Sequence, residues 1–360
     1  MQLLPAMHVG GVERGVVELS RALSANAIDS VVISRPGELC AEITNSGGKH
    51  YAFDCGSKNI FSVPARVYRL QKLLNTIAPD IVHVRSRVPA WLLAFVRQRF
   101  KVISTFHGIY SVSRYSAQMT HAEAIICPSQ AVRQHILQHY SVAAERLHLI
   151  HRGVDLHYFD PTAVQEEISA GLRQRLQLAE RTVFAIVGRG SGLKGHALFL
   201  QAFARLCNNS NFSKPPLALL VGDFSAKHKQ RIQQLAQSLQ LAPALRFAGV
   251  VRDMREIYQC SDVVVSASTQ PEAFGRTVAE AIAMQRAAVA PAHGGALDII
   301  RTGENGILFT PGDAEALAAA MQQATTLPRN ALRQSVQQFS LARMATQTQT
   351  LYQQLMAQSH

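Results

Sequence analysis

The stretch that decides the fold is DVVVSASTQPEAFGRTVAEAIAM, which runs from Asp262 to Met284. It begins with three valines, passes through a loop with proline and glycine, and ends in an alanine-rich helical pattern. A buried strand, a loop and a helix in this order form the repeating unit of a doubly wound α/β sheet. Glu272 and Glu280 stand at the loop and the helix with seven residues between them, where packing alone does not require a carboxylate.

Short apolar runs of the same kind recur between longer helical patterns, after a first strand at the amino end that enters a glycine turn. The first series of expected strands comprises Val31–Ser34, Asp80–Val84, Val102–Phe106 and Ala124–Ser129. The second series begins after Arg181 and comprises TVFAIVG, LALLVG, LRFAG, DVVVSAS and AAVAP. Two series predict two Rossmann-like domains, 1–160 and 161–335. The segment 150–161 contains glycine, aspartate and proline and is expected to be the linker, and a final helix is expected within 336–360.

Length and composition indicate a packed globular protein. The chain has 360 residues, of which 48% are hydrophobic and 17% charged, and this length favours two domains. No apolar run approaches the roughly 18 residues that cross a bilayer, and the amino end lacks the pattern of a signal peptide. Five scattered cysteines, none in CxxC spacing, favour reduced thiols in a cytoplasmic protein over a disulfide framework or a zinc site.

The net charge is strongly positive. It is +12, from 36 Lys and Arg against 24 Asp and Glu, and the excess is shared by both halves of the chain. Such a field attracts phosphorylated ligands, anionic lipid or nucleic acid, although a merely soluble basic surface explains the charge as well. A nucleic-acid-binding protein is the less favoured alternative, because the chain has one tryptophan and neither an RNP-like nor a helix-turn-helix pattern.

Two glycine loops follow expected strands and could approach a phosphate. In MHVGGVERGVVELSRAL, Gly10 and Gly11 precede a helical pattern, so backbone N–H groups and the helix N-terminus can face an anion; a tight turn would use the same glycines. In FAIVGRGSGLKGH, Gly188 ends a strand, and Arg189 and Lys194 follow in a glycine-rich loop. Two cations at the carboxyl end of a sheet favour a diphosphate clamp over a solvated loop.

The Asp262–Met284 stretch itself offers both anion and hydroxyl recognition. The free N–H groups of Ala273, Phe274 and Gly275 at the start of the helix can hold a phosphate. Carboxylate oxygens accept several hydrogen bonds and suit sugar hydroxyls, so we expect Glu272 to bind a hexose and Glu280 a ribose. A solvated helix face would explain Glu280 alone, but the paired spacing favours the ligand role.

Together these residues resemble the retaining glycosyltransferases of the GT-B fold in family 4 (group 1), of the type that builds lipopolysaccharide. The positions that match the family motifs are Gly10, Gly11, Arg189, Lys194, Glu272 and Glu280. The resemblance implies two Rossmann-like domains facing a cleft, with the last helix crossing back to the N-terminal domain. It also implies transfer of a hexose from a UDP- or GDP-sugar without a metal or other cofactor. A GT-B sugar-nucleotide epimerase is the alternative enzyme.

The resemblance extends to further donor contacts. His107 in STFHG matches a histidine that contacts the donor sugar from the N-terminal domain. A histidine that only caps the end of a strand would show the same sequence pattern. Val251 lies in a segment similar to the loop that contacts the nucleotide base. The resemblance therefore implies Glu272, His107, Arg189 and Lys194 as catalytic residues, with Gly188, Val251 and Glu280 among the donor-binding ones.

The acceptor is indicated by weaker signs. The helical pattern Asn59–Leu74 carries Arg66, Arg69 and Lys72 beside apolar residues, and Arg97–Val102 adds further cations. A basic helix with an apolar face can rest on anionic lipid, although an ordinary domain helix with a solvated basic face looks the same. We expect a glycan or lipid-linked acceptor, with a cytoplasmic protein peripheral on the inner face of the membrane.

Overall fold

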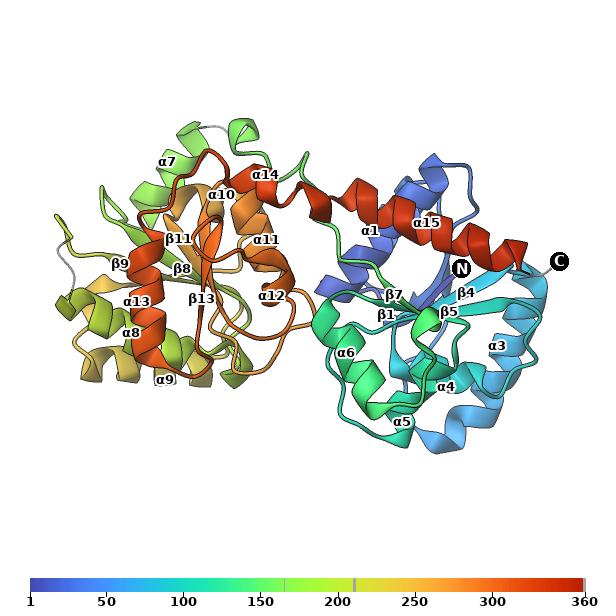
Figure 1. The fold of residues 1–360 in the computed structure, drawn as a ribbon. Coiled ribbons are helices and arrows are strands. Elements are labelled where there is room, and N and C mark those ends of the chain that lie inside the picture. Colours follow the sequence, from blue (N-terminus) through green and yellow to red (C-terminus); the bar gives the residue numbers. More distant parts are fainter. Residues whose placement is uncertain (165, 210–211, 359–360) are drawn as a thin grey trace. The chain divides into compact units, whose positions relative to one another are not determined.

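The computed structural model describes residues 1–164, 166–209 and 212–358, and it consists of two compact units (Figure 1). Unit 1 is Met1–Gly153 with Leu341–His360, and unit 2 is Val154–Ser340. The chain therefore leaves unit 1 a few residues before the expected boundary at 160 and returns to it a few residues after 335.

The described part of unit 1 is built on a seven-stranded sheet in the order β3-β2-β1-β4-β5-β6-β7. All of its strand pairs are parallel, so the carboxyl ends of its strands meet at one edge. The strands are β1 Gln2–Ala6, β2 Val31–Arg35, β3 Lys49–Ala52, β4 Ile81–Val84, β5 Lys101–Thr105, β6 Ala124–Cys127 and β7 Leu147–Leu149.

One face of this sheet is covered by the first helix and the last. The helices of unit 1 are α1 Gly11–Ala25, α2 Cys40–Asn45, α3 Val63–Ile77, α4 Arg87–Leu93, α5 Arg114–Ala117, α6 Gln130–His139 and α15 Leu341–Ala357. Leu19 and Leu23 of α1 share an apolar cluster with Leu351 and Leu355 of α15, which runs beside α1 in Figure 1. The C-terminal helix is therefore part of the core of unit 1.

The described part of unit 2 has a six-stranded parallel sheet in the order β10-β9-β8-β11-β12-β13. Its strands are β8 Val183–Val187, β9 Leu217–Val221, β10 Leu245–Gly249, β11 Val263–Val265, β12 Ala287–Pro291 and β13 Gly306–Phe309. Its helices are α7 Glu166–Arg175, α8 His196–Asn209, α9 Ala226–Ser238, α10 Met254–Cys260, α11 Arg276–Ala283, α12 Ala296–Ile299, α13 Ala314–Ala324 and α14 Leu332–Ser335.

Both faces of the unit 2 sheet are buried. Phe184 and Ile186 of β8 pack in the cluster that contains α8, α11 and α13, whereas Val183 and Ala185 pack in the cluster with Leu172 of α7 and residues of α10. Alternate residues of a strand point to opposite faces, so a continuous apolar run is what a sheet covered on both sides requires. The prediction of two doubly wound α/β domains is confirmed.

Short 3₁₀ helices connect many of these elements. They are Ile60–Ser62, Gln118–His121, Ala144–Arg146, Pro161–Ala163, Gly192–Lys194, Ala242–Ala244 and Gln337–Phe339. Among the helices of the described ranges, none combines the length and the apolar character that a membrane crossing needs. All five cysteines carry free thiols.

Candidate active site

The sheet order of unit 2 creates a crevice beside two of the predicted site loops. From the central strand β8 the chain continues to β9 on one side, and it later returns to β11 on the other side of β8. At such a switch point the connections leave to opposite faces, and ligands of open α/β sheets bind there, at the carboxyl ends of the strands. The Gly188–Lys194 loop follows β8 and the Ser268–Glu272 loop follows β11, so the topology brings the two together.

Lys194 and Glu272 are in direct contact. The Lys194 Nζ lies 2.7 Å from Glu272 Oε1, and the Ser268 hydroxyl donates to the same oxygen at 2.5 Å. The Thr269 N–H donates to the Leu193 carbonyl at 2.9 Å, which joins the two loops through their backbones. Each partner keeps hydrogen-bonding capacity: an ammonium has three donors, and no residue of the described ranges donates to Glu272 Oε2.

The surroundings keep Glu272 ionised. Burial raises the pKa of Glu272, but the charge and hydrogen bond of Lys194, the Ser268 hydroxyl and, last, the His293 ring outweigh burial, so the pKa lies below its usual value. At neutral pH the site therefore holds a carboxylate that accepts hydrogen bonds, next to an ammonium that donates them.

Arg189 is not part of this contact. Its side chain is exposed and forms no hydrogen bond or ion pair with the described residues. A Cβ atom at Gly188 would lie 3.1 Å from three carbons of the Lys194 side chain, so this glycine makes room for the lysine. The structure thus brings Lys194 to Glu272 and leaves the diphosphate role of Arg189 a prediction.

The backbone between the two glutamates contains the start of α11. Gly275 has φ +102 and no side chain of the described residues caps the helix after it, so its first N–H groups are available to a ligand. The Phe274 ring is buried and packs edge-on against Phe339 at 5.6 Å between centroids. Phe274 and its neighbour Ala273 can therefore contribute to a ligand only through the backbone.

Glu280 does not lie on a solvated helix face. It is buried, its Oε2 accepts from the Tyr258 hydroxyl at 2.8 Å, and its Oε1 lies 3.2 Å from Arg276 Nε. Burial and the charge of Glu280 hold the pKa of Tyr258 well above its usual range. Because both oxygens are engaged inside unit 2, the predicted ribose contact of Glu280 stays a prediction.

The contacts of Tyr258 and Arg276 with Glu280 were not predicted from the sequence. The spacing of Arg276 and Glu280, four residues apart on one helix, is a detectable signal for an ion pair. Tyr258 gave no such signal, because it comes from another helix. Val251, the predicted base contact, is half-buried in the loop after β10, next to Val250, which is 73% exposed.

The corresponding edge of unit 1 holds the other glycine loop. A Cβ atom at Gly10 would come within 2.3 Å of Glu13 Oε2, so a side chain there would displace the flexible end of Glu13 on the first turn of α1. Arg152 donates to the Gly11 carbonyl. A Cβ atom at Gly15 would lie 2.6 Å from one nitrogen of Arg152 and 3.5 Å from one of Arg85. Two guanidinium groups, neither of them predicted, therefore lie against the start of α1.

His107 follows β5 at this edge as an uncharged ring. Burial, and then the charges of Arg85 and Arg152, hold the pKa of His107 well below its usual value. Both of its ring nitrogens are buried and have no partner among the described residues. A neutral imidazole can donate one hydrogen bond and accept one, which suits a hydroxyl ligand.

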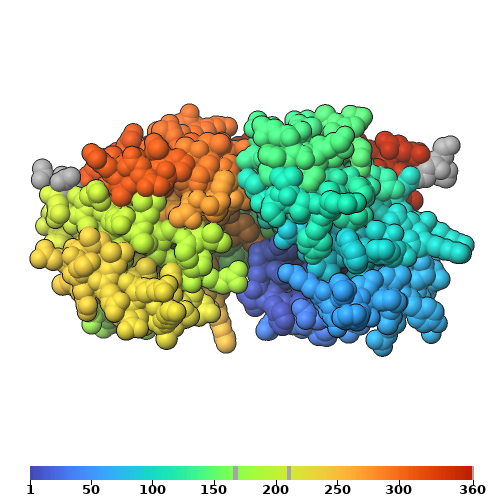
Figure 2. Space-filling model, turned by 90° about the horizontal axis from the view of Figure 1, so that it is seen from below, coloured from blue at the N-terminus to red at the C-terminus, as the bar shows by residue number. Residues whose placement is uncertain are grey.

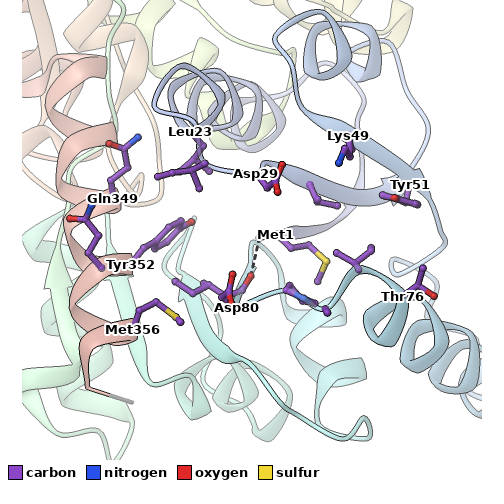
Figure 3. A pocket seen from close by; sticks show the side chains of 17 residues that line it. Met1, Leu23, Asp29, Lys49, Tyr51, Thr76, Asp80, Gln349, Tyr352 and Met356 are labelled. Atoms are coloured by element: carbon purple, nitrogen blue, oxygen red, sulfur yellow. Dashed lines mark hydrogen bonds between the residues drawn. The ribbon is translucent and has the colours of Figure 1, made fainter. Parts of the chain in front are cut away.

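A pocket at the opposite, amino edge of the unit 1 sheet contains none of the predicted site residues. It has a volume of about 720 Å³, and Figure 3 shows Asp29, Lys49 and Asp80 facing Tyr352 and Met356 of α15 around it. Within the described ranges, no three His, Cys, Asp or Glu side chains come together as a metal site would require.

Two family models match the chain in succession. The model described as Glycosyltransferase Family 4 matches residues 9–158, which include Gly10, Gly11 and His107. The model described as Glycosyl transferases group 1 matches residues 171–339, which include Arg189, Lys194, Glu272 and Glu280. Each match falls largely within one structural unit.

Individual proteins agree with the family models. The chain is 25% identical to the lipopolysaccharide core biosynthesis glycosyltransferase LpsE of Rhizobium meliloti, over 87% of this chain and 85% of that protein. It is similar to the structure of a glycosyltransferase from Rickettsia africae, with a TM-score of 0.88 and 28% identity over 99% of this chain and 98% of that one. HepE of Anabaena, solved with UDP and glucose, has the same fold, with a TM-score of 0.82 and 22% identity over 97% of this chain and 98% of that one.

Proposed function

Because the chain belongs to the group 1 and family 4 glycosyltransferases, we propose that it transfers a hexose from a nucleoside diphosphate sugar to an acceptor hydroxyl with retention of configuration. The observation that carries the proposal is the meeting of Lys194 and Glu272 at the switch point of unit 2. This pair supplies a cation for a diphosphate and a carboxylate for a sugar within one contact. The similarity to HepE, which was solved with UDP and glucose, supports a nucleotide sugar as the donor.

In the proposed reaction, negative charge grows on the leaving diphosphate while the sugar approaches an oxocarbenium ion. That charge would be stabilised by Lys194, by the free N–H groups at the start of α11 and by the exposed side chain of Arg189. No metal is required in this scheme. Glu272 orients the sugar through its hydroxyls. The departing phosphate accepts the proton of the acceptor hydroxyl on the same face, which retains the configuration.

Donor turnover in two variants tests the proposal. Removing one charged group that stabilises the transition state costs roughly 3 kcal/mol, or about a hundredfold in rate, so Lys194→Ala and Glu272→Ala should each lose that much transfer. Arg301→Ala is the matched control, because Arg301 also pairs with a glutamate, at 3.7 Å, but both partners are exposed. Near-normal transfer by both test variants would overturn the assignment.

The donor can be identified by thermal shift. UDP-, GDP- and ADP-sugars should be compared at a hundredfold excess over the dissociation constant, where a specific ligand stabilises the folded state by about 2.7 kcal/mol. A chain that is stabilised by none of them contradicts the proposed donor class.

We further propose a glycan or lipid-linked acceptor of the cell envelope, with the enzyme on the cytoplasmic face of the membrane. The similarity to the lipopolysaccharide core enzyme LpsE supports this class. A basic and apolar face of unit 1 supports it as well. Its exposed apolar residues are Ile60, Phe61, Tyr68 and Phe95, and its exposed cations are Lys58, Arg69, Lys72, Arg97 and Arg99.

The two predicted segments of this basic and apolar face lie together. Tyr68 of α3 lines the same groove as Phe95, Arg97 and Arg99, and Figure 2 shows the two segments, in light blue and cyan, on one side of unit 1. Arg66 was wrongly expected on this face: it is buried and donates to the Ser62 hydroxyl and the Asn59 carbonyl. Asp80 lines this same groove, Asp54 lines a second groove with Arg69 and Lys72, and both carboxylates weaken the positive field.

Vesicle flotation tests the basic and apolar face. The protein should float with anionic vesicles and not with neutral ones, and Arg69→Ala with Lys72→Ala should weaken binding by roughly 30-fold, at about 1 kcal/mol per cation. Lys227→Ala with Arg231→Ala removes the same charge from exposed positions of unit 2 and serves as the control. Equal losses in both double variants would contradict a specific face.

A further inference from the structure

His293 lies in the loop after β12, next to the Glu272 loop. β12 pairs with β11 in parallel, and the Ser266 N–H donates to the Val289 carbonyl at 2.8 Å, so both strands end at the same edge. Parallel neighbours deliver their following loops side by side. The sequence HGGAL after β12 therefore continues directly beside the Ser268–Glu272 segment.

The backbone of this loop is packed onto Glu272. The Gly295 N–H donates to the Glu272 carbonyl at 2.8 Å. Gly294 has φ +64, and a Cβ atom there would lie 2.5 Å from the same carbonyl oxygen. No larger residue fits between the two loops at Gly294, so the glycines hold the backbone that follows His293 against the backbone of Glu272.

The two ring nitrogens of the half-buried His293 are shielded from solvent and unsatisfied. Neither Nδ1 nor Nε2 has a hydrogen-bond partner among the described residues, although both atoms are shielded from solvent. In either neutral tautomer one nitrogen donates and the other accepts. Buried polar groups are nearly always satisfied, so an imidazole with two open positions calls for a partner that is not part of the chain.

Sugar hydroxyls can supply the hydrogen-bond partners that Glu272 and His293 lack. The carboxylate of Glu272 only accepts hydrogen bonds, and its Oε2 has no donor among the described residues. A hydroxyl group donates one bond and accepts others. A hydroxyl bound to Glu272 thus needs a donor for its own oxygen, and a ring N–H beside it supplies one.

We propose that His293 binds hydroxyl groups of the transferred sugar together with Glu272 and so contributes to the choice of donor sugar. This inference rests on the proposed function, because it assumes that a nucleotide sugar occupies the switch point of unit 2. It adds His293 to the expected donor site, and His293 is not one of the motif positions named above.

The affinity for a sugar nucleotide, compared with the affinity for its free nucleoside diphosphate, separates the role of His293 from the proposed function of the whole chain. The probe is the sugar nucleotide that stabilises the wild-type chain most among the UDP-, GDP- and ADP-sugars, and its affinity is compared with that of the matching UDP, GDP or ADP. His293→Ala should weaken the sugar nucleotide roughly three- to tenfold, as expected for one hydrogen bond, and leave the free nucleotide unchanged. His293→Asn, which keeps an N–H donor, should recover part of the loss.

His157→Ala is the matched control, because this imidazole is in the same unit but exposed. The ligand-free His293→Ala protein loses no hydrogen bond to a described residue, so a loss of affinity confined to the sugar nucleotide reports a contact with the ligand. Wild-type affinity of His293→Ala for the sugar nucleotide would overturn the inference and indicate that water satisfies the ring. Equal weakening of both ligands would assign His293 to the diphosphate and overturn it too. A wild-type chain that binds no nucleotide would instead overturn the proposed function.

Discussion

At the carboxyl edge of unit 2 Glu272 and Glu280 are already paired with cations, whereas the corresponding edge of unit 1 presents two guanidinium groups and a neutral imidazole. Glu272 pairs with Lys194 and Glu280 with Arg276. In unit 1, Arg85 and Arg152 lie against the start of α1, and His107 is uncharged. Yet both sheets share the same strand order through their first six strands.

This difference shows that the fold supplies the place for a ligand and the side chains supply its chemistry. The switch point of unit 2 offers acceptors for hydroxyls beside a donor for a phosphate. The switch point of unit 1 offers donors for anions. Three measurements test this difference between the two units. The single tryptophan, Trp91, lies in unit 1 on α4 and can be used to follow that unit. Its fluorescence follows unit 1, while circular dichroism follows both units.

The largest effect should come from Glu280→Ala. Removing one partner of a buried ion pair costs up to about 3–5 kcal/mol; here it leaves the buried Tyr258 hydroxyl and the half-buried Arg276 without the Glu280 acceptor. The variant should therefore unfold at lower urea by circular dichroism, with Trp91 fluorescence changing much less. Glu280→Gln keeps an acceptor for the Tyr258 hydroxyl and should lose less. A loss below about 1 kcal/mol would contradict the idea that paired carboxylates hold unit 2 together.

The next effect is a difference in acid sensitivity. Burial, followed by the charge of Arg85, holds the pKa of His83 well below its usual value, as burial does for His107; in unit 2, burial and His228 lower the pKa of His196 to about 4. The unfolded chain protonates these rings below about pH 6.5 and the folded chain does not, so stability is full above that pH and falls as the pH falls.

For each such histidine, one pH unit below 6.5 should cost about 1.4 kcal/mol. Between pH 6.5 and 5.5 unit 1 should lose more stability than unit 2. Among the described residues, five histidines of unit 1 have a lowered pKa and one of unit 2 does: His50, His83, His107, His135 and His148 against His196. Urea titrations followed by Trp91 fluorescence and by circular dichroism at the two pH values measure the difference. A steeper loss in unit 2 would reverse the comparison.

The smallest effect should appear in a matched pair of tyrosines. Tyr258 donates to the charged Glu280 at 2.8 Å, and Tyr352 of α15 bonds to the neutral His83 at 2.7 Å. Hydrogen bonds to charged groups contribute about 1.5–3 kcal/mol, and neutral ones about 0.5–1.5 kcal/mol. Tyr258→Phe should therefore destabilise unit 2 more than Tyr352→Phe destabilises unit 1. Equal losses in equilibrium unfolding would mean that the charge of Glu280 adds nothing.

The central strands could be predicted from the sequence, as could β10 at one edge of the unit 2 sheet, but the other edge strands could not. The apolar runs at Val31–Ser34 and Ala124–Ser129 became β2 and β6, since strands covered on both faces need continuous apolar residues. The strands missed were β3, β7 and β13, which lie at sheet edges. KHYA of β3 and LHL of β7 are short and polar, because an edge strand is only partly covered.

The candidate site could be predicted only where its residues share one loop or helix. The spacing of Glu272 and Glu280 pointed to the switch point of unit 2, and its loops proved to meet there. The direct contact of Lys194 with Glu272 could not be foreseen, nor could the contact of Tyr258 with Glu280, because each joins distant elements. Arg85 and Arg152 were missed for the same reason. The orphaned ring of His293 becomes apparent only when its missing partners can be checked.

The way the chain passes between the units has a practical consequence. Val154 and Ser340, the two ends of unit 2, form a parallel backbone bridge, and the Val154 N–H donates to the Phe339 carbonyl at 2.8 Å. On the unit 1 side, a Cβ atom at Gly153 would lie 2.5 Å from Leu341 Cα. Unit 2 is thus a cassette whose insertion points adjoin. Ligating Gly153 to Leu341 would restore a continuous unit 1, and a homologous cassette could be spliced in without rerouting the backbone.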